Sequence, residues 1–256
     1  MITGASSGIG VEIARLLAER GHGLTLVARR EDRLRELADE LSAKHPGRRY
    51  EVFAADLADA AAREKLAADV AATGLDVAVL VNNAGFGGHS EFVDAAPSGR
   101  DVEMVRLNVE AVTDLLARYL PGMVERRSGA VINVASTAAF QPMPGTATYA
   151  ATKAFVLSQS EALAQELKGT GVTLTAVCPG PVKTEFAEVA GVGELAESAP
   201  EFVWLSAEEV AEAAVDGAAK GKRTVVPGAF NQVGTLLGRV APRSLSLPLI
   251  DRGWNR

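Results

Sequence analysis

Apolar residues follow two alternating patterns along the chain: short continuous runs, and longer segments with helical spacing. The runs at residues 24–28, 76–81, 129–135 and 172–177 are typical of strands buried on both faces of a parallel sheet. Between such runs lie amphipathic segments, of which residues 102–118 are the longest example. The alternation predicts an α/β fold with a single Rossmann-type, doubly wound parallel sheet of about seven strands and helices on both faces.

We find no linker that would divide the 256 residues, so one dinucleotide-binding and catalytic domain is expected over 1–256. Residues 185–205 mix scattered apolar side chains with Gly, Ala and Glu, which indicates a substrate lid with short helices. Residues 229–256 form a variable tail. Three roles are open for this tail: it covers the pocket, it forms a subunit contact, or it touches a membrane surface. The membrane contact, through Arg239, Arg243 and Arg252, is a minor alternative.

Charge and cysteine content exclude several classes of function. The net charge of -6 opposes a nucleic-acid surface, which needs clustered positive charge. A lone Cys178 excludes an intramolecular disulfide and a cysteine-rich zinc site, and the three histidines lack metal-site spacing. One free cysteine fits a reducing compartment, so we expect a cytoplasmic protein that binds neither metal nor nucleic acid.

The segment Thr3-Gly4-Ala5-Ser6-Ser7-Gly8-Ile9-Gly10 precedes a helical pattern. Glycines there let the backbone approach a diphosphate, and the helix directs its first N–H groups toward the anion, although a tight turn alone also favours glycine. Only Met1 and Ile2 remain for the strand that leads into this loop. We therefore expect a shortened central strand, and either the natural start lies upstream or the chain is clipped.

Two further positions suggest an adenosine site. Arg29 and Arg30 follow the second strand, where an acidic residue would bind the ribose 2′-OH of NAD and arginines instead fit a 2′-phosphate. The alternative is a solvated charge pair at a helix entry. Asp56 ends the third strand. Its carboxylate either accepts a hydrogen bond from the adenine amino group or caps the next helix.

The motif Tyr149-Ala150-Ala151-Thr152-Lys153 places a phenol and an ammonium one helical turn apart. A nearby cation is expected to lower the pKa of Tyr149 and make it an acid/base for a substrate oxygen. Alone, the spacing equally fits a solvated lysine beside a packed ring. Ser136 ends a buried strand and can converge on the same pocket, whereas Asn108 on an apolar helix face needs buried partners.

Taken in order, these motifs, with Asn82-Asn83-Ala84-Gly85 and Pro179-Gly180, resemble the short-chain dehydrogenase/reductase family up to about Thr184. The chain looks like a bacterial NADP-dependent branch that is similar to ketoacyl and 17β-hydroxysteroid reductases. The resemblance implies that Tyr149 is the general acid or base, that Lys153 lowers its pKa and holds the nicotinamide ribose, and that Ser136 binds the substrate oxygen. It also implies that Asn108 holds a water of a proton relay.

Together, the motifs and the resemblance predict an NADP(H) site, NAD being the less favoured cofactor. Its residues are Gly4, Ser6, Ser7, Gly8, Ile9, Gly10, Arg29, Arg30, Asp56, Leu57, Asn83, Ala84, Gly85, Tyr149, Lys153, Pro179, Gly180, Val182 and Thr184. The expected activity is hydride transfer between nicotinamide and the carbonyl or secondary alcohol of a mostly apolar small molecule, in a homodimer or homotetramer. A catalytically silent nucleotide-binding or scaffold protein of the same fold is the alternative.

Overall fold

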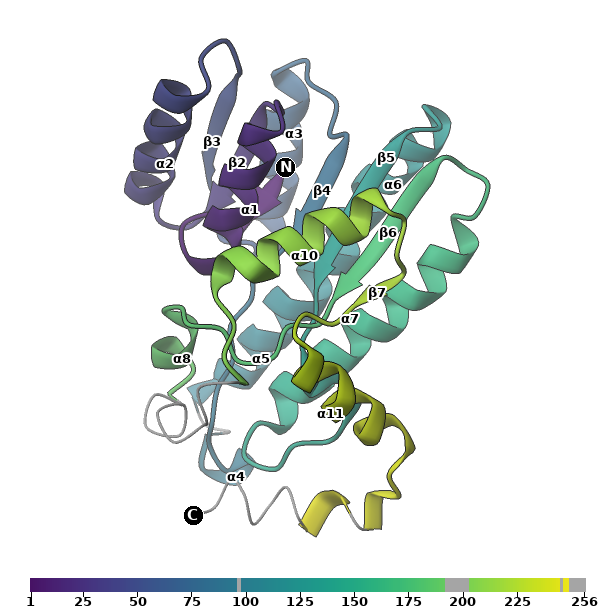
Figure 1. The fold of residues 1–256 in the computed structure, drawn as a ribbon. Helices are drawn as coiled ribbons and strands as arrows, with labels where there is room; N and C mark the ends of the chain where they lie inside the picture. The colour runs from purple at the N-terminus through teal and green to yellow at the C-terminus, as the bar shows by residue number, and fades with distance from the viewer. Residues whose placement is uncertain (96–97, 192–202, 245, 249–256) are drawn as a thin grey trace.

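Parallel strands form one sheet in the order β3-β2-β1-β4-β5-β6-β7 in the computed structural model (Figure 1). The structure describes residues 1–95, 98–191, 203–244 and 246–248. The strands within these ranges are β1 Ile2–Thr3, β2 Leu24–Ala28, β3 Tyr50–Ala54, β4 Val79–Asn82, β5 Gly129–Val134, β6 Val172–Val177 and β7 Thr224–Val225. The strand order reverses between β1 and β4, so the predicted doubly wound α/β sheet is confirmed.

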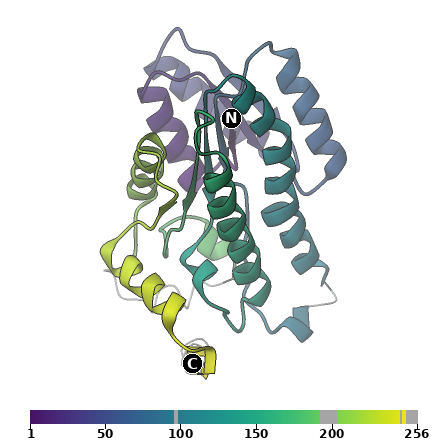
Figure 2. The same cartoon turned by 90° about the vertical axis from the view of Figure 1, so that its right-hand side faces the viewer.

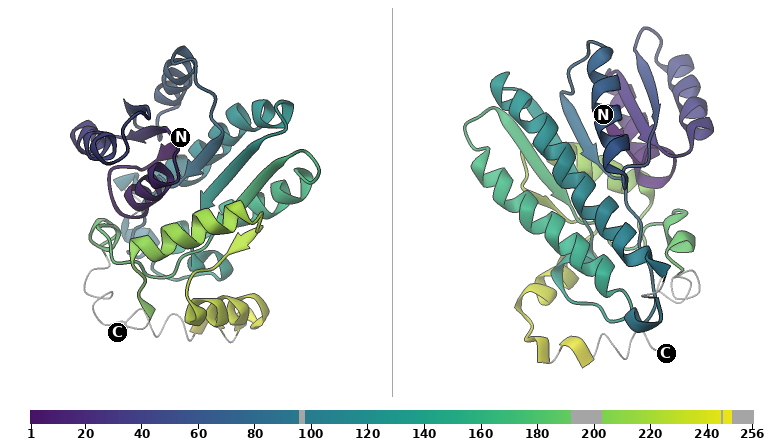
Figure 3. Two further views of the ribbon diagram at one scale, coloured as in Figure 1. Left: turned by 45° about the horizontal axis from the view of Figure 1, so that its top comes forward. Right: turned by 180° about the vertical axis from the view of Figure 1, so that it is seen from behind.

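Helices cover both faces of the sheet, as Figures 2 and 3 show. One face carries α1 Gly8–Glu19, α2 Glu31–Lys44 and α10 Ala207–Ala219, and the other carries α3 Ala60–Ala72, α6 Ala111–Glu125 and α7 Ala147–Glu166. Each layer buries its own apolar core against the sheet, with Ile13, Leu34 and Val210 in the first and Leu66, Leu115 and Val156 in the second. This two-sided burial is why β2 is apolar at nearly every position.

Short elements gather near the carboxyl ends of the strands. They are α4 Phe92–Ala95, the 3₁₀ helix η3 Thr137–Phe140, α8 Phe186–Val189 and α11 Ala229–Val240. In Figure 1, α8, α4 and α11 all lie below the sheet, at the end where a doubly wound fold binds its ligands. Ser206 is the N-cap of α10 and forms a capping box, in which its hydroxyl accepts from the N–H of Glu209 and the Glu209 carboxylate accepts from the N–H of Ser206.

Several boundaries differ from those expected from the sequence. The long helix predicted over 102–118 begins earlier, at α5 Arg100–Val105, and continues through the π-helical turn η2 Arg106–Glu110 into α6. π-Turns often mark functional positions, and this one contains Asn108. β7 ends at Val225, two residues before Pro227, which has no N–H to donate to a ladder.

The central strand β1 is as short as the sequence predicts. Ile2 is fully buried and pairs with Leu26 of β2 on one side and Val81 of β4 on the other. The carbonyl of Met1 extends the ladder by accepting from the N–H of Val81 at 2.9 Å. Thr3 therefore leaves the sheet directly into the glycine-rich loop.

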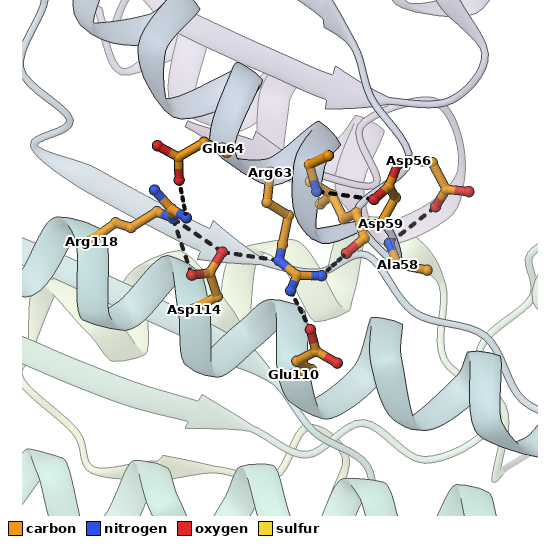
Figure 4. Close-up of polar contacts among 10 residues, drawn as sticks. Asp56, Ala58, Asp59, Arg63, Glu64, Glu110, Asp114 and Arg118 are labelled. Atoms are coloured by element: carbon orange, nitrogen blue, oxygen red, sulfur yellow. Dashed lines mark hydrogen bonds and ion pairs between the residues drawn. The ribbon is translucent and has the colours of Figure 1, made fainter.

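A buried arginine connects α3 to the η2–α6 helix (Figure 4). The Arg63 side chain is only 4% exposed, and its guanidinium donates to Asp114 at 2.9 Å, to Glu110 and to the carbonyl of Leu57 at 2.8 Å. A fully desolvated guanidinium is tolerated only when its donors are satisfied, as they are here. Arg63 thereby fixes the loop after β3 against the helix that carries Asn108.

Replacing Arg63 with methionine is expected to lower the free energy of unfolding by about 2–3 kcal/mol, because Asp114 and the Leu57 carbonyl lose a buried donor. Urea unfolding at pH 7 measures the change. Arg118→Met is the control: Arg118 also binds Asp114 but is 28% exposed, and its loss is expected to cost less than about 1 kcal/mol. Equal losses in the two variants would contradict the role assigned to Arg63.

The predicted tail begins with α11, an amphipathic helix. Its Phe230 and Thr235 line the cleft described below. Phe230 is nevertheless 57% exposed, and Leu236, Leu237 and Val240 are exposed as well. Arg252 lies outside the described residues. Among the described helices, none has both the length and the apolar character needed to cross a membrane.

Candidate active site

A cleft of about 800 Å³ lies at the carboxyl ends of the central strands, and the glycine-rich loop forms one wall of it. Gly4 adopts a left-handed backbone with φ of 66°, and a Cβ on Gly10 would lie 2.3 Å from the carbonyl oxygen of Gly4. Ser7 is the N-cap of α1, but its side chain makes no capping hydrogen bond. The first N–H groups of α1 are thus left to the cleft, where they fit the diphosphate of a dinucleotide.

Thr3 and Asn83 hold this loop in place. The Thr3 hydroxyl accepts from the N–H groups of Asn83 at 2.9 Å and Ala84 at 3.0 Å, and the Asn83 amide donates to the carbonyls of Thr3 and Gly4. Asn83 is among the residues predicted to bind the cofactor. Both hydrogens of the Asn83 amide are instead committed to the loop, so Asn83 shapes the cleft and Thr3 is a structural partner that sequence reasoning missed.

The adenosine end carries the predicted arginines. Arg29 and Arg30 both line the cleft, and the guanidinium of Arg30 donates to the Ser6 hydroxyl at 3.1 and 3.2 Å. Arg30 is also the N-cap residue of α2, yet its side chain points to the glycine loop. The Arg30 side chain thus lies against the glycine loop at the cleft, and its role in binding a 2′-phosphate stays a prediction.

Asp56 and Leu57 also line the cleft, after the neighbouring strand β3. The Asp56 carboxylate accepts from the N–H of Ala58 at 3.0 Å and caps no helix, so the capping role considered for it is wrong. Asp59 caps α3 instead, by accepting from Ala61 at 2.9 Å, because the loop runs two residues further before the helix begins. Asp56 faces the cleft and keeps acceptor capacity toward it.

Ser136, Tyr149 and Lys153 meet at the other end of the cleft. Ser136 follows β5 and caps η3, while Tyr149 and Lys153 lie one turn apart on α7. Lys153 is 6% exposed, and its Nζ donates to the Val134 carbonyl at 2.9 Å and lies 5.8 Å from the centre of the Tyr149 ring. The phenol and the Ser136 hydroxyl are thus hydrogen-bonded to each other at the cleft, and the ammonium lies near the phenol ring.

The pKa of Tyr149 differs from the sequence-based expectation. Burial raises it to about 12, and a hydrogen bond with Ser136 opposes part of that rise. Burial also lowers the pKa of Lys153 to about 8. Desolvation penalises both charged forms here and outweighs the attraction we expected between phenolate and ammonium. At neutral pH the phenol is therefore protonated and ready to donate.

Asn108 is 1% exposed, and its amide is hydrogen-bonded to groups of the protein. Its Oδ1 accepts from the Phe86 N–H at 3.1 Å, and its Nδ2 donates to the Phe86 carbonyl and to the Thr152 hydroxyl. Thr152 in turn donates to the Tyr149 carbonyl at 2.7 Å. These contacts are the buried partners that the sequence requires for Asn108. Thr152, inside the Tyr-Lys motif, links Asn108 to the backbone of Tyr149, and sequence reasoning missed this link.

Most of the predicted cofactor residues line the cleft, including Pro179, Val182 and Thr184; Gly10 and Asn108 lie behind its wall. A Cβ on Gly180 would come within 2.4 Å of Asn231 in α11, so the glycine is needed for the tail helix to pack there. Thr184 lies against Gly8, so the segment after β6 contacts the glycine loop. Cys178 is fully buried, which fits a packing role.

An apolar compartment extends from Tyr149. The ring of Phe186 packs on Tyr149 with centroids 5.7 Å apart, and further lining comes from Phe140, Met143, Trp204 and Phe230, with the uncharged Gln141, Asn231 and Thr235. These residues come from η3, the loop after it, α8, the segment before α10, and α11, which are far apart in the sequence. No single motif signals them, so sequence reasoning missed the compartment.

Residues 1–193 match the family described as short chain dehydrogenase. A short chain dehydrogenase of the fungus Pseudocercospora fijiensis is 39% identical over 72% of this chain, and the match spans 60% of that relative. The NADP-dependent 3-hydroxy acid dehydrogenase YdfG of Escherichia coli K12 is 36% identical, with 83% of this chain and 86% of that protein covered.

A short-chain dehydrogenase from Sphingobium yanoikuyae, solved in complex with NADPH, superposes with a TM-score of 0.80 at 34% identity. The match covers 98% of this chain and 92% of that chain. These similarities agree with the geometry of the cleft, in which the glycine loop fits a diphosphate and the other end holds the buried Tyr149 and Lys153. The chain belongs to the short-chain dehydrogenase/reductase family, whose members oxidise alcohols or reduce carbonyls with NAD(P).

Proposed function

We propose that this protein is an NADP(H)-dependent oxidoreductase that transfers hydride between nicotinamide and the carbonyl or secondary alcohol of a mostly apolar small molecule. The observation that carries the proposal is the meeting of Ser136, Tyr149 and Lys153 at one end of a cleft whose other end holds the glycine loop and Arg30. When bound, the nicotinamide supplies or accepts the hydride.

The side chains of the site orient the substrate, transfer the proton and stabilise the developing charge. In the direction of reduction, the hydroxyl of Ser136 orients the carbonyl oxygen and Tyr149 donates the proton, which its raised pKa keeps in place. The Lys153 ammonium stabilises negative charge that develops on the two oxygens and has hydrogens free for a ribose hydroxyl, since the Val134 carbonyl takes only one of them. Thr152 and Asn108 position α7. Oxidation of an alcohol uses the same groups in reverse.

The cofactor preference follows from the adenosine end. Arg30 is held toward the cleft by the Ser6 hydroxyl, and a guanidinium of this kind binds a 2′-phosphate by charge-assisted hydrogen bonds. Both the E. coli relative, by its name, and the Sphingobium enzyme, by its bound NADPH, use the phosphorylated cofactor. These observations support NADP(H) over NAD(H).

The apolar compartment supports a neutral substrate. Cations that line the described part of the cleft are Arg29 and Arg30 at the adenosine end and Lys153 beside Tyr149. An anionic substrate, such as the 3-hydroxy acids named for the E. coli relative, would leave its carboxylate among Phe140, Met143 and Phe230. Burying an unpaired carboxylate there is unfavourable, so ketones with apolar substituents fit better.

We extend the proposal to assembly and location. Val102 and Val105 lie on α5, the first part of the long α5–η2–α6 helix, and Phe155 lies on α7. They are 57%, 43% and 43% exposed, and these apolar side chains support a homodimer or homotetramer formed through the two long helices. The single buried, free Cys178 supports a reducing compartment such as the cytoplasm.

NADPH consumption with a panel of aryl and alkyl ketones, aldehydes and a 3-keto acid, run beside NADH, tests the function. We expect neutral apolar ketones to be reduced with kcat/KM at least about tenfold higher with NADPH than with NADH, since one charge-assisted phosphate contact contributes about 1.5–3 kcal/mol. Preference for the 3-keto acid would contradict the substrate class. Tight NADPH binding without turnover of any member would favour the silent nucleotide-binding alternative.

A further inference from the structure

A salt bridge crosses the mouth of the cofactor cleft. One oxygen of the Glu185 carboxylate accepts from Arg30 at 3.0 Å, and the other accepts from Arg33 at 2.6 Å. Glu185 directly follows Thr184, which lies against Gly8 of the glycine loop, whereas both arginines belong to the entry of α2. Figure 1 shows α8 below the end of the sheet that carries α1 and α2.

The groups around this carboxylate form an anion site. Arg30 donates to Ser6 with one edge of its guanidinium and to Glu185 with the other, and Arg33 supplies the next donor. These hydrogen bonds hold the pKa of the Glu185 carboxyl below its usual range, so it is ionised. The three side chains are 41–44% exposed, which lets an incoming anion from solvent exchange with the carboxylate.

We propose that Arg33 completes the 2′-phosphate site formed by Arg30 and Ser6, and that Glu185 is its resident counter-anion, which the 2′-phosphate of NADP displaces. The inference rests on the proposed NADP(H) function and deepens it. A phosphate group carries a charge of about -1.5 to -2 and three acceptor oxygens, whereas the carboxylate carries a single charge and two oxygens, so the phosphate pairs better with two arginines.

Two consequences follow from the exchange. Glu185 opposes the binding of phosphorylated cofactors in particular, because a cofactor without the 2′-phosphate leaves the salt bridge intact. Glu185 thus sets how strongly the enzyme discriminates NADP from NAD. Its release also frees the residue that precedes Phe186, whose ring packs on Tyr149, so occupation of the phosphate site is coupled to the cover over the reacting oxygen.

Calorimetric titration of the full chain with 2′,5′-ADP and with 5′-AMP, at pH 7 and low salt, tests the exchange without turnover. Glu185→Gln is expected to tighten 2′,5′-ADP binding about three- to fivefold, and Arg33→Met to weaken it about three- to tenfold, the range of a partly exposed ion pair. Binding of 5′-AMP is expected to stay within about twofold in both variants. Glu188→Gln, the same charge change on exposed α8, is the control and should leave both ligands unaffected.

Weaker binding of 2′,5′-ADP to Glu185→Gln would overturn the proposal, because Glu185 would then stabilise the bound phosphate instead of competing with it. Unchanged affinity in both variants would overturn it as well. If Glu185→Gln tightens 2′,5′-ADP while the wild-type protein reduces no carbonyl with NADPH, the phosphate site stands and the proposed enzymatic function fails. The wild-type protein and these variants therefore test the phosphate site and the enzymatic function independently.

Discussion

Tyr149→Phe is expected to lower kcat for NADPH-dependent carbonyl reduction by about 10³-fold, within the range of about 10²–10⁴ for a general acid. The substitution removes one oxygen from a ring that packs against Phe186, so the apolar contacts of the site remain. The dissociation constant of NADPH should stay within about twofold, because the glycine loop and the arginines are untouched. Stopped-flow reduction and fluorescence titration of NADPH measure the two quantities.

Tyr119→Phe provides the matched control. Tyr119 lies on α6, packs against the core beneath the sheet and does not line the cleft, so removal of its hydroxyl should change kcat by less than about twofold. A Tyr149→Phe protein with more than a tenth of wild-type turnover would show that the proton comes from another group. Loss of NADPH binding in that variant would instead indicate a structural role for the phenol.

Local patterns in the sequence were enough to predict the parts of the site that single segments build. The glycine loop is contained in eight consecutive residues, and Tyr149 and Lys153 share one helical turn, so their placement follows from backbone geometry alone. The sheet was predictable for a similar reason: strands buried on both faces, such as β2 and β6, are continuous apolar runs.

Properties that depend on tertiary contacts were missed or predicted with the wrong sign. The pKa of Tyr149 rises because the folded chain buries the phenol, and no spacing between two residues reports how much water remains around them. The ion pair between Glu185 and Arg33 joins residues 152 positions apart, and the apolar compartment draws on η3 and α11. Such contacts are fixed only when the helices dock on the sheet.

Domain boundaries, the lid and the tail remain predictions in part. The lid expected over 185–205 begins with the salt bridge of Glu185 and the short helix α8, which agrees with a cover over the cleft, while residues 192–202 lie outside those that the structure describes. Among the roles open to the tail, covering the pocket is the one that α11 supports, through Phe230 and Asn231.

Lys153→Met is expected to lower kcat/KM for reduction by at least about 10²-fold at pH 7, because the site loses the buried cation that stabilises developing negative charge. In the wild-type protein, kcat/KM should fall as the pH rises through about 8, where Lys153 loses its proton, while Tyr149 stays protonated to about 12. The variant should lack that step. Initial rates from pH 6 to pH 9.5, with saturating NADPH, measure both profiles.

The expected loss of activity in Lys153→Met does not come from unfolding, because the shifted pKa of Lys153 links the stability of the wild-type protein to pH. The pKa of Lys153 falls from 10.5 to about 8 on folding, so between these values the unfolded chain holds more protons and the free energy of unfolding rises with pH. Below about pH 8 the folded protein bears the cost of a buried charge, which methionine removes. Lys153→Met should therefore be at least as stable as wild type in urea at pH 7, and its stability should lack the rise between pH 8 and 10.5. A variant with wild-type kcat/KM, or one that loses activity only by unfolding, would contradict the electrostatic role of this ammonium group.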